Sequence, residues 1–191
     1  MDADWSVELG HDDPALEFPW TAPDRAQPYV DLRQRRDAVH ELPEARDCRE
    51  LGQFLLSLNA PTSPWLSAKC SVWLDDELGE AEAIYDANLK LCSYVDLIAC
   101  DVEARFSFDR HEQWAKSAAH RLSTDDEHPV VCELVVRRCW YHATSNTITD
   151  SSPGFYVTFY LVGYGHHESQ ARTRWANGLR QVAAVLTSSA P

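Results

Sequence analysis

The 191-residue sequence lacks several patterns that would point directly to a function. It opens on MDADWSVELG, which has neither the basic segment nor the apolar run of a secretory signal. No apolar stretch approaches the ~20 residues that a membrane-spanning helix needs. Basic residues are scarce: 17 Lys and Arg stand against 30 Asp and Glu, which gives a formal net charge of −13. Phosphate binding depends on clustered bases, so we expect neither nucleic acid nor an anionic membrane as a partner.

Paired cysteines at metal-binding or redox spacing are also absent. The six cysteines lie at positions 48, 70, 92, 100, 132 and 139, with no CxxC pair and no zinc-finger spacing. Most fall at apolar positions of expected strands or helices, where a free thiol packs as a small hydrophobe. We therefore expect reduced thiols and a cytoplasmic protein.

Catalytic and metal-binding motifs are missing as well. His111-Glu112 lacks the second histidine of a HExxH metalloprotease pattern, because position 115 is Ala. The adjacent His166 and His167 point in different directions on a helix, and no Ser or Cys lies in a recognisable nucleophile elbow. The sequence therefore predicts no catalytic residue, no metal and no cofactor, and it favours a binding role over an enzymatic one.

The clearest pattern present is a strand, a turn and a helix in residues 152–186. Aromatic and β-branched residues alternate from Phe155 to Val162, which predicts a strand. Both of its faces are apolar, so we expect a central strand covered on both sides. Gly163 and Gly165 then end the strand. A helix follows, because apolar residues recur at spacings of three and four: Ala171, Trp175, Leu179, Val182 and Leu186.

The rest of the chain carries weaker versions of these patterns. Two short strands at 5–9 and 16–20 are expected to form an N-terminal hairpin, followed by a surface connection to residue 42. The further expected elements are a helix from Pro43 to Asn59, a strand at 66–74, a long strand at 89–106 with a bulge at Leu97-Ile98, a helix capped by Ser107 or Asp109, and a strand at 130–142.

Together these elements predict a single domain, 1–191, with residues 1–42 as the hairpin and connection and 43–187 as the core. The expected fold class is α+β: a mostly antiparallel sheet of five to six strands with three helices packed on it. The three helices end near Asn59, Leu122 and Leu186, spacings of 63 and 64 residues, which suggests a ββα repeat. The alternative is coincidence, because Glu is favoured at helix starts and short matches arise by chance.

One candidate ligand site follows from the sequence. A strand–glycine–helix junction offers backbone amides and the positive end of a helix dipole to an anion. The last third, residues 129–191, holds five bases against three acids, so bases are available beside the junction. The candidate residues are Gly163, Gly165, His167, Arg172, Arg137 and Arg138. The alternative interpretation is a tight turn needed for packing, with the bases matched to charges within the protein.

The order of elements from Pro43 onward, together with the acidity, resembles that of type III secretion chaperones. The resemblance is one of order alone and shares no motif, so it serves as an analogy. Two functions fit the sequence. The first is an acidic, non-enzymatic protein-binding module of adaptor, chaperone or inhibitor type, bound to another protein or to itself as a homodimer. The second is a small-molecule or anion-binding domain, with or without enzymatic activity, at Gly163–Arg172.

Overall fold

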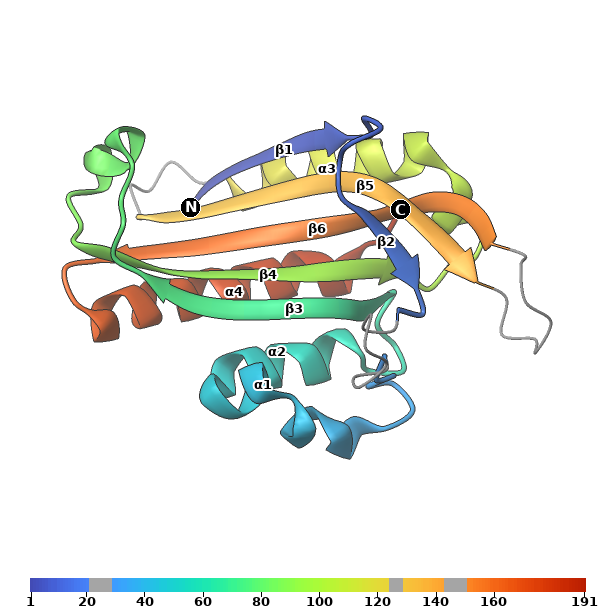
Figure 1. The fold of residues 1–191 in the computed structure, drawn as a ribbon, viewed down its shortest axis with the longest axis horizontal. Helices are drawn as coiled ribbons and strands as arrows, with labels where there is room; N and C mark the ends of the chain where they lie inside the picture. Colours follow the sequence, from blue (N-terminus) through green and yellow to red (C-terminus); the bar gives the residue numbers. More distant parts are fainter. Residues whose placement is uncertain (21–28, 124–128, 143–150) are drawn as a thin grey trace.

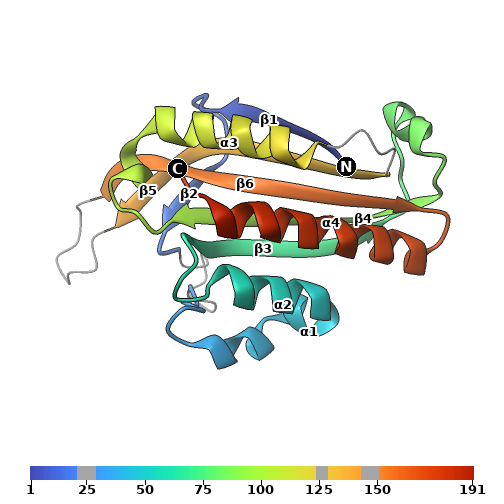
Figure 2. The same cartoon turned by 180° about the vertical axis from the view of Figure 1, so that it is seen from behind.

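The computed structural model describes residues 1–20, 29–123, 129–142 and 151–191, and it is an α+β structure built on a six-stranded sheet. Helices α3 and α4 cover one face of this sheet, whereas α1 and α2 lie beside its β3 edge (Figures 1 and 2). The strands are β1 (Asp2–Glu8), β2 (Ala15–Phe18), β3 (Trp65–Asp75), β4 (Leu89–Ala99), β5 (Val130–His142) and β6 (Ser151–Gly165). The α+β class and a six-stranded sheet confirm the coarse prediction.

The helix count is larger than expected. Within the described ranges there are four α-helices, namely α1 (Pro43–Asp47), α2 (Arg49–Leu58), α3 (Phe108–Leu122) and α4 (Glu168–Ser188). Three 3-10 helices accompany them: η1 (Arg36–Glu41), η2 (Glu80–Tyr85) and η3 (Ala104–Phe106). The helix expected from Pro43 to Asn59 is divided because Cys48 adopts an extended conformation, φ −132° and ψ 95°. None of the helices in these ranges is both long and apolar enough to cross a membrane.

The sheet is mixed, which corrects the prediction of a mostly antiparallel one. Its order is β1-β5-β6-β4-β3, with β2 also paired to β5. The pairs from β5 to β3 are antiparallel, but β1 and β2 both run parallel to β5. The expected N-terminal hairpin is therefore wrong: the chain turns at Gly10–Asp13 and continues along the same edge of β5. An alternating pattern identifies a strand but does not encode its partner.

Two details of the expected strands also change. The strand expected at 89–106 ends at Ala99, and the apolar residues beyond it belong to a turn and to η3. The bulge lies in β3 between Ser67 and Cys70 rather than at Leu97-Ile98.

The ββα repeat is also wrong, because β1 and β2 do not pair with each other whereas β3–β4 and β5–β6 do. Residues 23–28 of the expected surface connection lie outside the described residues, and its later part includes η1.

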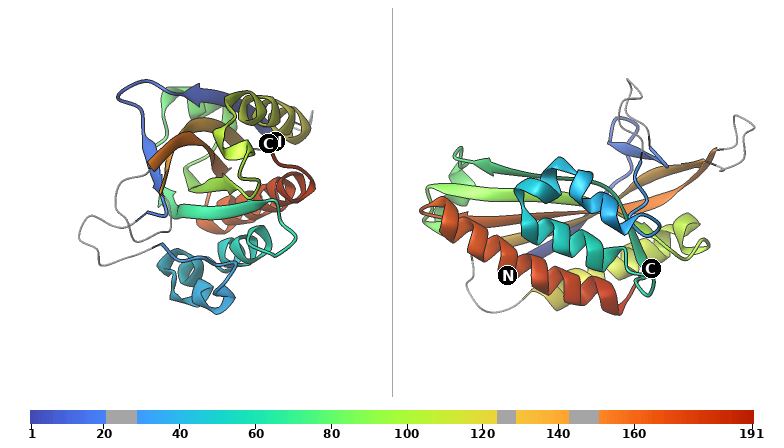
Figure 3. Two further views of the ribbon diagram at one scale, coloured as in Figure 1. Left: turned by 90° about the vertical axis from the view of Figure 1, so that its right-hand side faces the viewer. Right: turned by 90° about the horizontal axis from the view of Figure 1, so that it is seen from below.

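The main core lies between the sheet and its helices. Every residue of the expected α4 stripe is buried, including Trp175, whose indole N–H donates to Ser93 Oγ at 2.8 Å. The helix lies close to β6 because Gly163 has no side chain: a Cβ there would be 2.5 Å from the backbone nitrogen of Trp175. β6 is central, as predicted, but α-helices cover only one of its faces (Figure 3). The opposite face carries the tyrosines and polar residues of the same strand.

Candidate functional site

The glycines of the sequence-predicted ligand site serve helix packing. A Cβ at Gly165 would lie 2.6 Å from the backbone nitrogen of Ala171, nearly as close as the 2.5 Å contact at Gly163. The first turn of α4 therefore lies directly on β6. His167 caps this helix, since its Nδ1 accepts from the Gln170 N–H at 3.3 Å. These contacts match the alternative interpretation given above, a turn required for packing.

The arginines of that site lie apart from one another. Arg172 is 3.7 Å from carboxylate oxygens of both Glu50 and Glu168, so its charge is matched on the helix side. Arg137 pairs in register with Tyr156, seven residues from the Val130–Gly163 pair, and its side chain lies on the other face of the sheet. Arg138 is exposed. The structure thus does not bring these six residues into one site.

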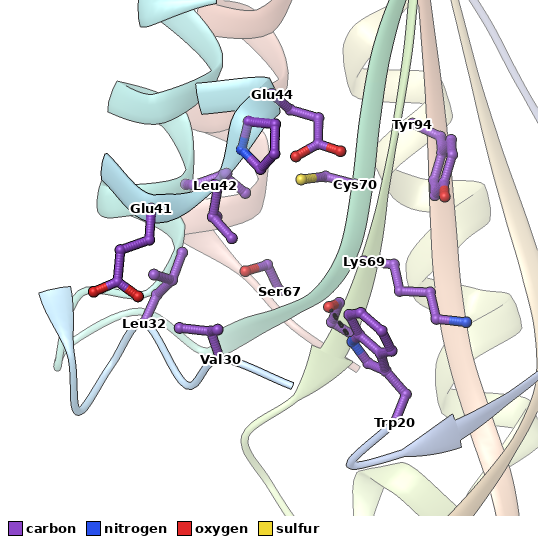
Figure 4. A pocket seen from close by; sticks show the side chains of 13 residues that line it. Trp20, Val30, Leu32, Glu41, Leu42, Glu44, Ser67, Lys69, Cys70 and Tyr94 are labelled. Atoms are coloured by element: carbon purple, nitrogen blue, oxygen red, sulfur yellow. Dashed lines mark hydrogen bonds between the residues drawn. The ribbon is translucent and has the colours of Figure 1, made fainter. Parts of the chain in front are cut away.

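A groove of about 430 Å³ lies elsewhere, along the outer edge of β3 (Figure 4). One wall comes from η1, α1 and the segment before them, and the other comes from β3 and from residues behind it on the face of the sheet opposite α4. Most of the lining is apolar or aromatic. The lining includes Trp20, Leu42, Glu44, Lys69, Cys70 and Tyr94.

The outer edge of β3 is covered over its first half. Trp20 donates its indole N–H to the Ala68 carbonyl at 2.8 Å, and Arg33 donates to the Trp65 carbonyl at 3.1 Å. The Asn59 side chain accepts from the Ser67 N–H at 3.1 Å. Beyond Lys69, the described residues no longer cover the outer edge in this way. Among the described residues, β4 is the sole strand partner of β3, and no hydrogen bond from another element reaches the backbone of residues 70–74.

The charged groups of the groove differ in their pairing. Glu41 on the rim is 3.0 Å from Arg35, and the Lys69 ammonium lies 5.2 Å from the centroid of the Trp20 ring. Glu44 is half-buried, and its carboxylate lies beside Cys70 (Figure 4). No described residue forms an ion pair or hydrogen bond with that carboxylate. Burial, together with the nearby negative charges of Glu44 and Asp96, raises the pKa of Cys70 to about 12, so the thiol is protonated at neutral pH.

A buried polar network adjoins the groove on the face of the sheet opposite α4. The β3 bulge places Ala68 and Lys69 opposite Asp96, which is only 5 % exposed. Asp96 accepts from the Thr158 hydroxyl at 2.6 Å, and that hydroxyl accepts from Arg137 at 3.1 Å. Burial raises the pKa of Asp96 to about 6, against the opposing effects of Thr158 and Lys69. A row of hydrogen-bonded side chains therefore runs across the sheet from Arg137 to Asp96, which lies opposite the groove residue Lys69.

This network is tied to the N-terminal strand. Arg137 extends across β5 to Glu8 of β1, with 2.6 Å between Nη2 and the carboxylate, and it also donates to the Tyr160 hydroxyl at 2.8 Å. The Arg137 side chain is almost fully buried, so the Glu8 carboxylate supplies the counter-charge that such burial requires. Arg137, predicted from the sequence as an anion ligand, thus holds two strands together.

Reactive groups are scarce around the groove. The thiol pKa is raised at every cysteine, chiefly by burial. The described ranges contain no group of three or more His, Cys, Asp or Glu side chains placed to hold a metal ion. The groove therefore offers an apolar lining, a carboxylate that no described residue pairs with, and a stretch of strand edge, which are features suited to binding.

Comparisons with protein-family models, with curated protein sequences and with solved structures found no match to this chain. Sequence reasoning also missed the groove, because its lining residues are scattered from Trp20 to Tyr94 and share no motif. One local signal was present: Trp73 and Leu74 are adjacent large apolar residues at the end of a half-polar strand, next to an acidic run. Such a stretch indicates an exposed edge only once the order of the strands is known.

Proposed function

We propose that this chain is a non-enzymatic protein-binding module of adaptor, chaperone or inhibitor type that binds its partner along β3. The observation that carries the proposal is the position of the groove, beside a strand edge without a strand partner among the described residues. Exposed edge strands present unpaired N–H and C=O groups to other chains, and natural proteins usually protect them. An edge left free beside an apolar groove is a feature that peptide-binding domains use.

The exposed apolar residues of β3 support a protein rather than a small molecule as the partner. Trp73 is 42 % exposed and Leu74 is 47 % exposed, and both lie beyond the groove toward the end of the strand. This end of β3 extends past α1 and α2 (Figures 1 and 3). A small molecule in the groove would leave both side chains in water, whereas an extended protein segment would cover the groove and the strand end together.

The remaining features agree with this proposal. All six cysteines are free thiols, which supports a reducing compartment such as the cytoplasm. Self-association is a less favourable use of the same edge, because each copy carries a net charge of −13 and two copies would repel each other. The anion-binding alternative at Gly163–Arg172 has no comparable support, since the glycines contact α4 and Arg172 faces two carboxylates.

Site-specific photo-crosslinking tests the proposal. A benzophenone amino acid at Trp73, in cells that express the protein, should yield a discrete protein adduct identifiable by mass spectrometry. Lys116 is exposed on α3, on the other side of the molecule, and the same probe there is the matched control. Filling the groove with Leu42→Trp should remove the adduct at position 73 while the circular dichroism spectrum is retained. Equal labelling at positions 73 and 116, or an adduct insensitive to Leu42→Trp, would refute the proposal.

A further inference from the structure

We propose, on the basis of the protein-binding function above, that the partner segment is extended and basic. It adds to β3 as an extra strand along residues 70–74 and places a Lys or Arg side chain against Glu44. Three observations support this proposal: a strand edge with no strand partner among the described residues, a carboxylate that none of those residues pairs with, and the sign of the charge around both.

The first observation is the geometry of the strand edge. A neighbouring strand lies about 4.8 Å from the one it pairs with, and its side chains alternate between the two faces of the sheet. The groove runs along this edge at Ser67–Cys70, so a segment paired with residues 70–74 would continue into it. Every second side chain of this segment would then enter the apolar groove near Leu42. Main-chain hydrogen bonds would supply affinity, and the groove would supply selectivity.

The second observation is the state of Glu44. Its carboxylate is half-buried in the groove wall beside Cys70, and no described residue pairs with it. A partly desolvated carboxylate without a partner is unfavourable, and a cation that reaches it relieves that cost. Glu41 on the same rim is already paired with Arg35, so of these two carboxylates Glu44 is the one without a partner in the described part of the chain. Its charge acts at the strand edge, since it contributes to the raised pKa of Cys70.

The third observation is the charge at the far end of the edge. Asp76 and Glu77 are exposed directly after β3, and Asp75 lies 3.5 Å from Lys90, the base nearest to it. The base that lines the groove, Lys69, is held over the Trp20 ring. A bound segment would therefore meet carboxylates at both ends. A basic segment complements this pattern, whereas a second copy, with a net charge of −13, would oppose it.

A peptide library supplies the probe for the test. Random 12-residue peptides displayed on phage are selected against the purified full chain and against the groove-filling variant Leu42→Trp. Peptides enriched on the wild-type chain alone should carry a Lys or Arg two or four residues from an apolar residue, the spacing that places both on one side of a strand. Synthetic copies are then titrated by fluorescence anisotropy.

Two comparisons separate the parts of the inference. Glu44→Gln should weaken binding of these peptides about tenfold or more, because a charge-assisted contact is lost, while Glu112→Gln on α3 should leave affinity unchanged. N-methylation of alternate peptide residues should abolish binding when it removes the donors that face β3, and should have little effect in the other register. This second comparison changes the peptide alone, so it does not depend on the folding of a protein variant.

The outcomes distinguish the inference from the function on which it rests. Groove-dependent peptides without a basic preference, bound equally by wild type and Glu44→Gln, would overturn the inference and leave the protein-binding function standing. Insensitivity to N-methylation in both registers would overturn strand addition. Failure to select any groove-dependent peptide would count against both. Binding of free butylammonium as tightly as of the peptides would show that Glu44 serves a small cation instead.

Discussion

Asp96 carries an energetic cost that its neighbours offset only in part. The carboxyl group is almost fully buried on the face of the sheet opposite α4, where the Thr158 hydroxyl donates a hydrogen bond to it. Lys69 and Arg137 act on it as nearby positive charges, yet burial dominates and raises its pKa from 3.8 to about 6. Ionised Asp96 is therefore less stable in the folded chain than in the unfolded one.

The sign of the pH dependence follows from this shift. Between about pH 4 and pH 6 the folded chain holds a proton on Asp96 that the unfolded chain has released, so ionisation of Asp96 lowers stability as pH rises through this range. The Asp96→Asn variant does not carry the cost of burying an ionised carboxylate. We expect its stability relative to wild type to increase from pH 4 to pH 7 by a value on the order of 3 kcal/mol, as measured by urea denaturation at each pH. A difference that stays constant with pH would contradict the assignment.

At the scale of elements, β6 and α4 pack closely against each other at Gly163. A side chain at Gly163 would meet the backbone of both Trp175 and Ala171, at 2.5 and 2.7 Å, and a backbone cannot rotate away as a side chain can. Gly163→Ala should thus force α4 away from the sheet and cost about 1–3 kcal/mol or more. Urea denaturation with Gly79→Ala as the control measures this, because a Cβ at Gly79 meets just one atom, Glu82 Oε2, at 3.7 Å. Equal stability of the two variants would contradict the packing role.

The sequence predicts elements better than it predicts their partners. The α4 stripe, the cap at Ser107 and the strand at 130–142 are all confirmed, because each depends on local periodicity or on a short-range hydrogen bond. The parallel pairing of β1 with β5 joins residues about 130 positions apart, and no local pattern encodes it. The groove could not be foreseen for the same reason. The roles of Gly163 and Arg137 depended on contacts with Trp175 and Glu8 that a sequence does not show.

At the scale of the whole molecule, the excess of acids opposes folding and favours a basic partner. The net charge of −13 generates repulsion across the folded chain, which is more compact than the unfolded one. The basic residues at the groove and in the polar network are already engaged, since Lys69 lies over Trp20 and Arg137 is paired with Glu8. The same field that weakens the fold would therefore attract the partner proposed above.

Salt should consequently act in opposite directions on stability and on binding. Raising NaCl from 20 to 200 mM shortens the screening length from roughly 20 Å to about 7 Å, so distant like charges no longer repel one another. The urea midpoint of the free protein should rise, while the affinity for basic peptides should fall. Partly buried pairs such as Arg137–Glu8 are screened less than exposed ones, and this pair should keep β1 on the sheet throughout. A urea midpoint that falls with salt would show that favourable surface ion pairs outweigh the acidic repulsion, and it would remove the electrostatic reason for a basic partner.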